Sequence, residues 1–382
     1  MCRINVLHIY KFYLTYAGGI ERTIQIITEG LKDKAIESRI LVCASDKTLK
    51  SKEEVIGNIK VSRANSLGIL FSTPLSTNFI NKFSLLSKDA DILHIHSPFP
   101  LGEVAYLALN PKNKRLVITY HADISQTRWA CLAPIYKHIL KRLLDKADCI
   151  IASSPKIIES SPILHTNINK CKIIPFGIDL DKWGLVTNEK KKELRDRLEI
   201  GNDKVVLFVG RLAYQKGLDF LITAMQIINA KLIIVGEGLL DKHLEKRSSE
   251  MSLENKVRFV GHVSGDELQI YYSIADVFVL PSITGGETFA LVQLEAMAFG
   301  VPVVNTNLAT GVTFVSPHNE TGLTVPPRDS VALANAINTI LENDELRQRF
   351  SENALERAKL FSLERMLRDT HKVYQDVMDH PL

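Results

Sequence analysis

One stretch near residue 290 constrains the fold of this chain more than any other part of it. Residues 275–281 form a strand-like run, and Gly285 and Gly286 follow it in a turn. A helical pattern then begins at Thr288, a residue suited to cap a helix, and Gly300 ends it. We expect a strand, a tight turn and a helix whose first N–H groups point back at the sheet, where phosphates bind. The residues expected at this helix N-terminus are Thr288, Phe289, Ala290 and Leu291.

Two glutamates, Glu287 and Glu295, accompany this turn and lie eight residues apart. On a helix this spacing is about two turns, or roughly 11 Å of rise, so both side chains fall on nearly the same face. Carboxylates at the helix tip and deeper along the same wall accept hydrogen bonds from hydroxyl groups. A sugar nucleotide, with hydroxyls at both ends and phosphates between them, fits this layout. Two surface acids on an ordinary helix are the alternative.

A second phosphate-binding pattern lies upstream of this stretch. A strand of apolar residues, 205–209, leads into Gly210, Arg211 and Lys216, and a helical run follows them. A strand, a glycine turn, two cations and a helix N-terminus together form an anion site. The loop is not a Walker A motif, because the glycine–lysine–serine or –threonine order is absent from it. A solvated pair of cations on a loop is the alternative.

Together with this basic motif, the Glu287 to Glu295 segment resembles the E-x7-E signature of retaining nucleotide-sugar glycosyltransferases of family 4. Residues 294–298, Gly300 and residues 302–304 are similar to that family too, and the resemblance covers nearly the whole chain. It is closest in character to bacterial surface-polysaccharide mannosyl- and rhamnosyltransferases. The resemblance implies the GT-B fold: two facing Rossmann-like domains with a donor cleft between them, and a C-terminal helix that crosses back to the first domain.

The order of the elements agrees with that α/β architecture. Strand-like runs alternate with helical stretches, which predicts parallel sheets with helices on both faces and ligands at the carboxyl ends of the strands. At 382 residues the chain is long enough for two domains. We expect the first domain at residues 1–180, joined by residues 362–382, and the second at residues 181–361. The expected strands of the first domain are residues 4–10, 39–43, 59–62, 91–96, 115–120 and 149–152.

The resemblance also assigns roles to individual residues. Arg211 and Lys216 match the pair that holds the leaving diphosphate, Glu287 would orient the transferred sugar, and Glu295 would bind the ribose. His121, at the end of a strand, matches the family's histidine that contacts the donor sugar, and a structural histidine is the alternative. The other expected substrate-binding residues lie in loops that follow strands: Gly18, Gly19, Gly210, His262 and Val263.

Two patterns raise the question of a metal. His94 and His96 alternate with apolar residues as a zinc pair would, but no third ligand is nearby in the sequence. Asp179 and Asp181 read as the D-x-D metal motif of the other glycosyltransferase fold, yet they lie in the expected crossover between domains. We therefore predict no metal and no other cofactor.

Charge is divided unevenly along the chain. Residues 1–180 hold 24 lysines and arginines against 15 aspartates and glutamates, whereas the remainder holds 23 against 28. A basic first half indicates an anionic partner, and nucleic acid is excluded because no basic-aromatic motif of the known modules is present. Residues 132–144 place an apolar stripe beside Lys137, Lys141 and Arg142, which is typical of a domain helix or of a helix on an anionic membrane.

The expected location is the cytoplasm, at the inner face of its membrane. The first residues lack the pattern of a signal peptide, no run approaches the length of a membrane span, and five scattered cysteines indicate reduced thiols.

The expected reaction is transfer of a hexose with retention of configuration, independent of metal. The resemblance favours GDP-mannose as donor and a polyprenyl-diphosphate-linked saccharide or growing polysaccharide as acceptor, in O-antigen, capsule or exopolysaccharide assembly. Two alternatives remain: a non-catalytic sugar-nucleotide-binding scaffold subunit, and a GT-B epimerase that acts on the sugar nucleotide itself. Hydrolysis or isomerisation of the donor without acceptor separates these alternatives.

Overall fold

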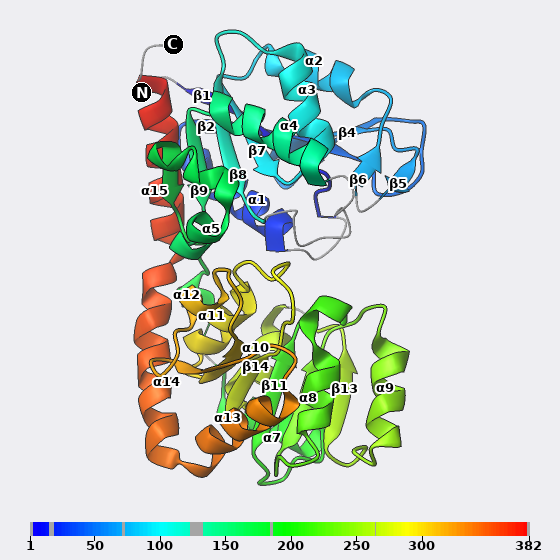
Figure 1. Cartoon of the computed structure of the whole chain (residues 1–382), viewed down its shortest axis with the longest axis vertical. Helices are drawn as coiled ribbons and strands as arrows, with labels where there is room; N and C mark the ends of the chain where they lie inside the picture. Colours follow the sequence, from blue (N-terminus) through cyan, green and yellow to red (C-terminus); the bar gives the residue numbers. More distant parts are fainter. Residues whose placement is uncertain are drawn as a thin grey trace. The chain divides into compact units, whose positions relative to one another are not determined.

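A computed structural model describes residues 3–14, 19–70, 73–122, 133–183, 186–263 and 265–379. The chain forms two compact units (Figure 1). Unit 1 comprises Met1–Phe176 with Arg365–Leu382, and unit 2 comprises Gly177–Glu364. The boundaries therefore lie within four residues of those expected at 180/181 and 361/362. Of the expected site residues, Gly18 lies outside the described part of the chain.

Unit 1 is built on an eight-stranded sheet in the order β10-β9-β8-β7-β1-β2-β4-β3. All neighbouring strands are parallel except β3, an antiparallel edge strand that the sequence analysis did not predict. The chain runs outward from β1 in one direction and then returns to add β7 on the other side, so the topological switch point lies between β1 and β7. The strands are β1 (Ile4–Ile9), β2 (Ile36–Cys43), β3 (Lys52–Ile56), β4 (Ile59–Ala64), β7 (Ile92–Ser97), β8 (Arg115–Tyr120), β9 (Cys149–Ala152) and β10 (Cys171–Ile173), with a separate hairpin of β5 (Gly68–Leu70) and β6 (Thr73–Leu75).

The central strands of unit 1 are buried on both faces, as expected for a parallel sheet covered by helices. Every residue of β7, β8 and β9 is buried, which explains their nearly continuous apolar sequences. The covering helices are α1 (Gly19–Gly30), α2 (Phe79–Ser87), α3 (Pro100–Leu109), α4 (Ala133–Lys146), α5 (Pro155–Ser160), α6 (Pro162–His165) and α15 (Leu363–Asp379).

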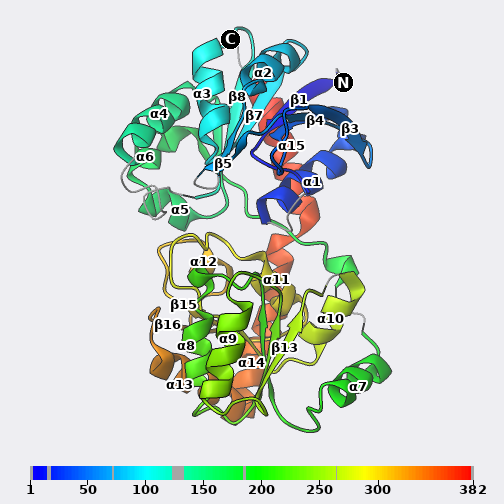
Figure 2. The ribbon, with the colours of Figure 1, turned by 90° about the vertical axis from the view of Figure 1, so that its right-hand side faces the viewer.

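The C-terminal helix α15 belongs largely to unit 1, although it is the last element of the chain. Its buried residues recur on one face, from Met366 through Val373 and Tyr374 to Val377. Leu367 lies so close to Gly30 of α1 that a β-carbon at Gly30 would meet it at 2.4 Å. This helix, drawn in red in Figure 2, confirms the expected return of the C-terminus to the first domain.

Unit 2 is built on a six-stranded sheet in the order β13-β12-β11-β14-β15-β16, with all pairs parallel. Its switch point lies between β11 and β14, by the same reasoning as in unit 1. The strands are β11 (Val205–Val209), β12 (Lys231–Val235), β13 (Val257–Gly261), β14 (Val277–Leu280), β15 (Val303–Thr306) and β16 (Gly322–Val325).

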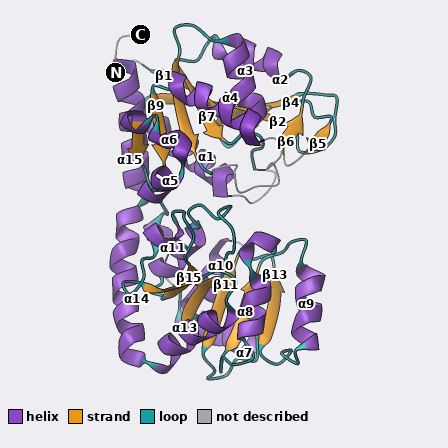
Figure 3. Ribbon diagram, in the orientation of Figure 1, coloured by secondary structure: helices purple, strands orange, loops and turns teal. Residues whose placement is uncertain are grey.

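Helices accompany the sheet of each unit, as Figure 3 shows by colour. In unit 2 they are α7 (Asn188–Arg197), α8 (Leu218–Ala224), α9 (Asp241–Glu250), α10 (Gly265–Ser273), α11 (Leu291–Ala298), α12 (Val312–Val315), α13 (Ser330–Glu342) and α14 (Asp344–Ala358). Within the described ranges, no helix combines the length and apolarity needed to cross a bilayer.

Candidate functional site

The turn that joins β14 to α11 differs from the sequence expectation. Helix α11 begins at Leu291, and Ala290 before it has a left-handed backbone with φ of 60°. Thr288 is therefore not the helix cap; its carbonyl oxygen instead accepts a hydrogen bond from the Gly311 N–H at 2.7 Å. The predicted helix end is confirmed, because α11 stops at Ala298 and Gly300 follows with φ of 68°.

Glu287 consequently lies in the turn and not on the helix. Its backbone N–H donates to the Thr284 carbonyl at 3.2 Å, as in a β-turn. The expected arrangement of Glu287 and Glu295 along one helix face is wrong, because the irregular residues before Leu291 break the helical spacing. Only Glu295 lies on α11.

The Glu287 carboxylate forms an ion pair with the Lys216 amine, across the switch point between β14 and β11. The same carboxylate oxygen, Oε2, accepts a hydrogen bond from the Ser282 hydroxyl at 3.1 Å. The Lys216 and Glu287 side chains are 15% and 11% exposed, so most of each charge is shielded from water. Two residues that the sequence analysis assigned to different parts of the ligand thus contact each other.

A glycine makes this contact between the two loops feasible. Gly217 has φ of 66°, and a β-carbon there would meet the Pro281 carbonyl oxygen at 2.1 Å. The loops are also joined by a hydrogen bond from the Ile283 N–H to the Gln215 carbonyl at 2.9 Å. Neither Gly217 nor Ser282 was among the predicted site residues, because their importance depends on which two loops become neighbours.

Arg211 differs from its predicted partner Lys216. It follows β11 in the same loop but is exposed, and within the described chain its guanidinium has no ion pair. A free guanidinium presents five donors in a planar fork that suits phosphate oxygens. The Lys216 ammonium has three donors, so it can bind a phosphate oxygen while it pairs with Glu287, whereas the whole charge of Arg211 is available to a ligand.

The N-terminus of α11 supplies neutral donors to the same region. The first N–H groups of any helix have no partner within it, and here they begin at Leu291. The Phe289 ring is 2% exposed and packs edge-on against Phe361, with ring centroids 6.0 Å apart. Its side chain therefore belongs to the core, and only its backbone is suited to a ligand.

Glu295 is buried more deeply than Glu287. It is 3% exposed, and its Oε2 accepts a hydrogen bond from the Tyr272 hydroxyl of α10 at 2.8 Å. Tyr272 stacks on Phe299 and is itself fully buried. A contact between Glu295 and a ribose remains a prediction, and Tyr272 is a residue that the sequence analysis missed.

Glycines also bring together the loops that follow β11, β12 and β13. A β-carbon at Gly236 would meet the Gly210 carbonyl oxygen at 2.0 Å, so only glycine fits there. The Glu237 carboxylate accepts a hydrogen bond from the backbone N–H of His262 at 3.2 Å. His262 is exposed and Val263 is half-buried beside this contact. Glu237 thus fixes the loop that is expected to border the nucleotide base.

In unit 1, His121 follows β8 and is 1% exposed. Its backbone N–H donates to the Ser97 carbonyl at 2.9 Å, and its ring Nε2 lies 3.2 Å from Nδ1 of His96. Burial, together with the nearby charge of Lys11, lowers the pKa of His121 to about 3. Gly19, the first residue of α1, has open space where a side chain would stand. His121 is therefore neutral at physiological pH, and Lys11 is a neighbour that the sequence analysis missed.

The sequence analysis found no third ligand near His94 and His96, but the structure places a third histidine beside them. His8 of β1 is the register partner of His94, and the three side chains place nitrogen atoms within 4.8 Å of one another. However, the His94 and His96 rings are stacked 4.4 Å apart at 21°, so their in-plane lone pairs do not converge. Both His94 nitrogens also lie 2.7 Å from hydroxyl groups, those of Tyr374 and Thr119. This geometry favours hydrogen bonding over chelation.

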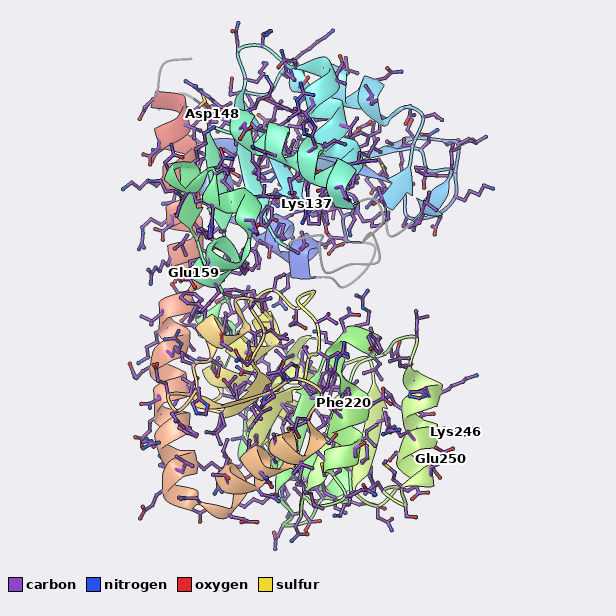
Figure 4. All side chains as sticks on the ribbon, viewed as in Figure 1. Lys137, Asp148, Glu159, Phe220, Lys246 and Glu250 are labelled. Atoms are coloured by element: carbon purple, nitrogen blue, oxygen red, sulfur yellow. The ribbon has the colours of Figure 1, made fainter. Side chains whose placement is uncertain are left out.

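Helix α4 shows where the apolar stripe of residues 132–144 lies, apart from Leu132, which is outside the described residues. Tyr136, Leu140 and Leu143 are buried in the core of unit 1. The domain-helix interpretation holds for these three residues, whereas Ile135 of the same stripe is 65% exposed. The cations beside it, including Lys137 (labelled in Figure 4), are exposed.

Two sequence families match this chain: Glycosyltransferase Family 4 over residues 17–182, and Glycosyl transferases group 1 over residues 190–357. The O-antigen chain mannosyltransferase C of Escherichia coli is 30% identical, over 98% of this chain and 99% of that protein. A D-rhamnosyltransferase of Pseudomonas aeruginosa is also 30% identical, over 92% of this chain and 90% of that protein.

A solved structure extends the similarity to the whole fold. The sucrose-phosphate synthase of Thermosynechococcus elongatus superposes with a TM-score of 0.81 at 25% identity, over 98% of this chain and 99% of that one. Both units of this chain therefore have counterparts in a single known protein.

Proposed function

We propose a specific reaction for this chain, which belongs to glycosyltransferase family 4 and has the GT-B fold. It transfers a hexose from a nucleotide-diphosphate sugar, with retention of configuration, to a lipid-linked or growing polysaccharide acceptor in O-antigen, capsule or exopolysaccharide assembly. The observation that carries this proposal is the Lys216–Glu287 pair at the switch point of unit 2, together with the exposed Arg211 in the same loop as Lys216.

The leaving diphosphate explains why cations gather at this point. A glycosyl diphosphate already carries its leaving group, so the barrier lies in positive charge at the anomeric carbon and negative charge on the departing phosphate. We propose that Arg211, Lys216 and the N–H groups of Leu291 and Val292 at the start of α11 donate to the phosphate oxygens. Preorganised donors of this kind lower a barrier because they do not reorganise during the reaction.

Lys216 and Glu287 act as a unit in this proposal. A carboxylate alone would repel the diphosphate, but the Lys216 amine stands in an ion pair with it and compensates its charge. The Glu287 carboxylate, held additionally by Ser282, then accepts hydrogen bonds from sugar hydroxyls and fixes the orientation of the ring. His121 is proposed to contact the same sugar, and Glu295 the ribose.

Retention through a covalent glycosyl–enzyme intermediate does not suit this site. That route uses two carboxyl groups about 5 Å apart that flank the scissile bond. Here Glu287 is paired with a lysine, which reduces its nucleophilicity, and Glu295 is buried under Tyr272. We infer front-face transfer, in which the departing phosphate oxygen helps to accept the proton of the attacking hydroxyl.

GDP-mannose is the favoured donor. The name of the Escherichia coli relative supports mannose, and the Pseudomonas aeruginosa relative is named for rhamnose. A panel of GDP- and UDP-sugars, each tested for thermal stabilisation of the full chain, identifies the donor, since a ligand at a hundredfold excess over its Kd stabilises by about 2.7 kcal/mol.

The reaction itself is tested with the donor that binds. The anomeric configuration of the product, read by NMR, distinguishes retention from inversion. A scaffold subunit would bind the donor without transferring its sugar, and an epimerase would isomerise it without acceptor. Either outcome would replace the transferase proposal.

An anionic membrane surface is a further proposed partner, with the protein on its cytoplasmic face. The support is the excess of lysine and arginine over aspartate and glutamate in residues 1–180, together with the exposed cations of α4. Such charges attract anionic headgroups at about 1 kcal/mol each, which permits reversible binding without insertion.

A further inference from the structure

Three histidine rings from neighbouring strands form a hydrogen-bonded line through the interior of unit 1. Nδ1 of His8 lies 3.2 Å from Nε2 of His96, and Nδ1 of His96 lies 3.2 Å from Nε2 of His121. All three are buried, on or directly after β1, β7 and β8. His94, although stacked on His96, is not part of this line because its nitrogens lie against Tyr374 and Thr119.

Burial keeps every ring in the line uncharged. It lowers the pKa of His8 and of His121 to about 3, and that of His96 well below its usual value. A neutral imidazole carries one proton, so one ring nitrogen donates and the other accepts. When both N···N contacts are hydrogen bonds, the three rings have only two proton arrangements. In each arrangement all the N–H groups point the same way along the line.

The two arrangements differ at the ends. When His96 carries its proton on Nδ1, His121 must carry one on Nδ1 and His8 presents a bare Nε2. When His96 carries its proton on Nε2, His121 presents a bare Nδ1 and His8 donates from Nε2. Both end atoms, Nδ1 of His121 and Nε2 of His8, are buried and lack a hydrogen-bond partner within the described residues.

An unpartnered buried nitrogen is costly, and a polar atom of a ligand would satisfy it. We propose that His96 and His8 are positioning residues that set the ring tautomer of His121, so that His121 Nδ1 presents an N–H to an oxygen of the donor. This assignment rests on the proposed function, since it takes the sugar or phosphate oxygen of a nucleotide-diphosphate sugar as the acceptor. The bare Nε2 of His8 is the other end of the same arrangement.

The direct test uses 15N NMR of the histidine rings in the full-length protein, with each signal assigned through a single substitution. Nitrogen shifts distinguish the two neutral tautomers from each other and from the charged ring. Addition of GDP-mannose is expected to shift His121, His96 and His8 together toward the tautomer with the proton on Nδ1. The tautomer of His94 is expected to stay unchanged. A shift of His121 that is not accompanied by shifts of His96 and His8 would overturn the proposal.

The coupling is also measurable without any donor, which separates it from the proposed function. Replacement of the end ring, His121→Phe, removes one constraint and is expected to alter the tautomer ratio of His8, two rings away. The matched control is Tyr106→Phe, a buried aromatic residue of α3 in the same unit. If His8 responds equally to both variants, or to neither, the line does not couple its rings, whatever reaction the protein performs.

Kinetics then show whether the coupling matters for transfer. His96→Leu is expected to lower kcat about tenfold with little change in KM, whereas His96→Gln, whose amide both donates and accepts, is expected to recover most of the loss. His94→Leu controls for disruption of the core. If kcat falls equally in His96→Leu and His94→Leu and does not recover in His96→Gln, His96 only packs the core and does not position His121.

Discussion

Each unit has a polar cluster at the switch point of its sheet, but the residues of the two clusters differ in charge and burial. In unit 1 the cluster between β1 and β7 consists of uncharged, buried imidazoles on or next to strands. In unit 2 the cluster between β11 and β14 consists of a lysine, an arginine and a glutamate on loops.

The reason for the difference is solvation. Side chains within a parallel sheet lie between two layers of helices, where a charge loses its water and the group becomes neutral instead. Loops beyond the strand ends keep enough water for Lys216 and Glu287 to remain a partly exposed ion pair. Unit 2 is therefore equipped to bind charge, and unit 1 to form directed hydrogen bonds with an uncharged part of a ligand.

The largest effect is expected in the charged cluster. Glu287→Ala removes the group that orients the sugar, and turnover is expected to fall roughly a thousandfold or more while the fold is retained. A steady-state assay with circular dichroism checks this.

The matched control for that prediction is Glu250→Ala. Glu250 is an exposed acid of α9 that pairs with Lys246 at 3.6 Å (both labelled in Figure 4), and such surface pairs contribute little to stability. Near-normal turnover in Glu287→Ala would mean that the ion pair of unit 2 is not the reaction site.

The two cations of the charged cluster are expected to differ in how much their loss lowers turnover. Arg211→Ala and Lys216→Ala are each expected to reduce turnover by on the order of a hundredfold or more, because each removes a phosphate partner. The loss in Lys216→Ala is expected to be the larger, since it also leaves the Glu287 carboxylate without its counter-charge. Nucleoside diphosphate binding, measured by calorimetry, should weaken in both variants; unchanged affinity for GDP and UDP alike would place the phosphate elsewhere.

A low pH is expected to decrease the folding stability of unit 1. Burial lowers the pKa of His8 and His121 to about 3, so the unfolded state binds more protons than the folded state below pH 6.5. Stability is thus fully present above about pH 6.5 and is lost as the pH falls from 6.5 toward 3. Hydrogen exchange of the β1 and β7 amides at pH 7 and pH 5 measures this, and equal protection at both values would contradict it.

The charge imbalance predicts a smaller effect at membranes. The full chain is expected to sediment with anionic vesicles at low salt and to be released at high salt, because the Debye length falls from about 10 Å at 0.1 M to about 3 Å at 1 M. Substituting Lys137 and Lys141 together by alanine should weaken this binding by about 2 kcal/mol. Equal binding to neutral and anionic vesicles would remove the membrane as a partner.

The smallest expected effect is that of chelation. Because Arg211, Lys216 and the α11 N–H groups are proposed to stabilise the leaving diphosphate, activity is expected to be unchanged by EDTA. Loss of activity that manganese or magnesium restores would show that the charged cluster needs a metal in addition to these residues.

The sequence by itself determined the alternation of strands and helices and the residues that follow each strand. The positions of Arg211, Lys216, Glu287 and His121 in segments that follow strands were predictable from local patterns, whereas their roles stay predictions. The start of α11 was not, because the Thr288 cap pattern competes with the left-handed turn at Ala290, and the loop contact to Gly311 supports the turn.

Only the tertiary structure decided which of these residues meet. Lys216 and Glu287 are 71 positions apart, and their contact requires the close approach of two loops that Gly217 allows. His8 and His96 are 88 positions apart, and they are neighbours because β1 and β7 pair at the switch point. A local pattern specifies what a residue can do, whereas the order of strands in a sheet specifies its partners, and that order is set by the packing of the whole domain.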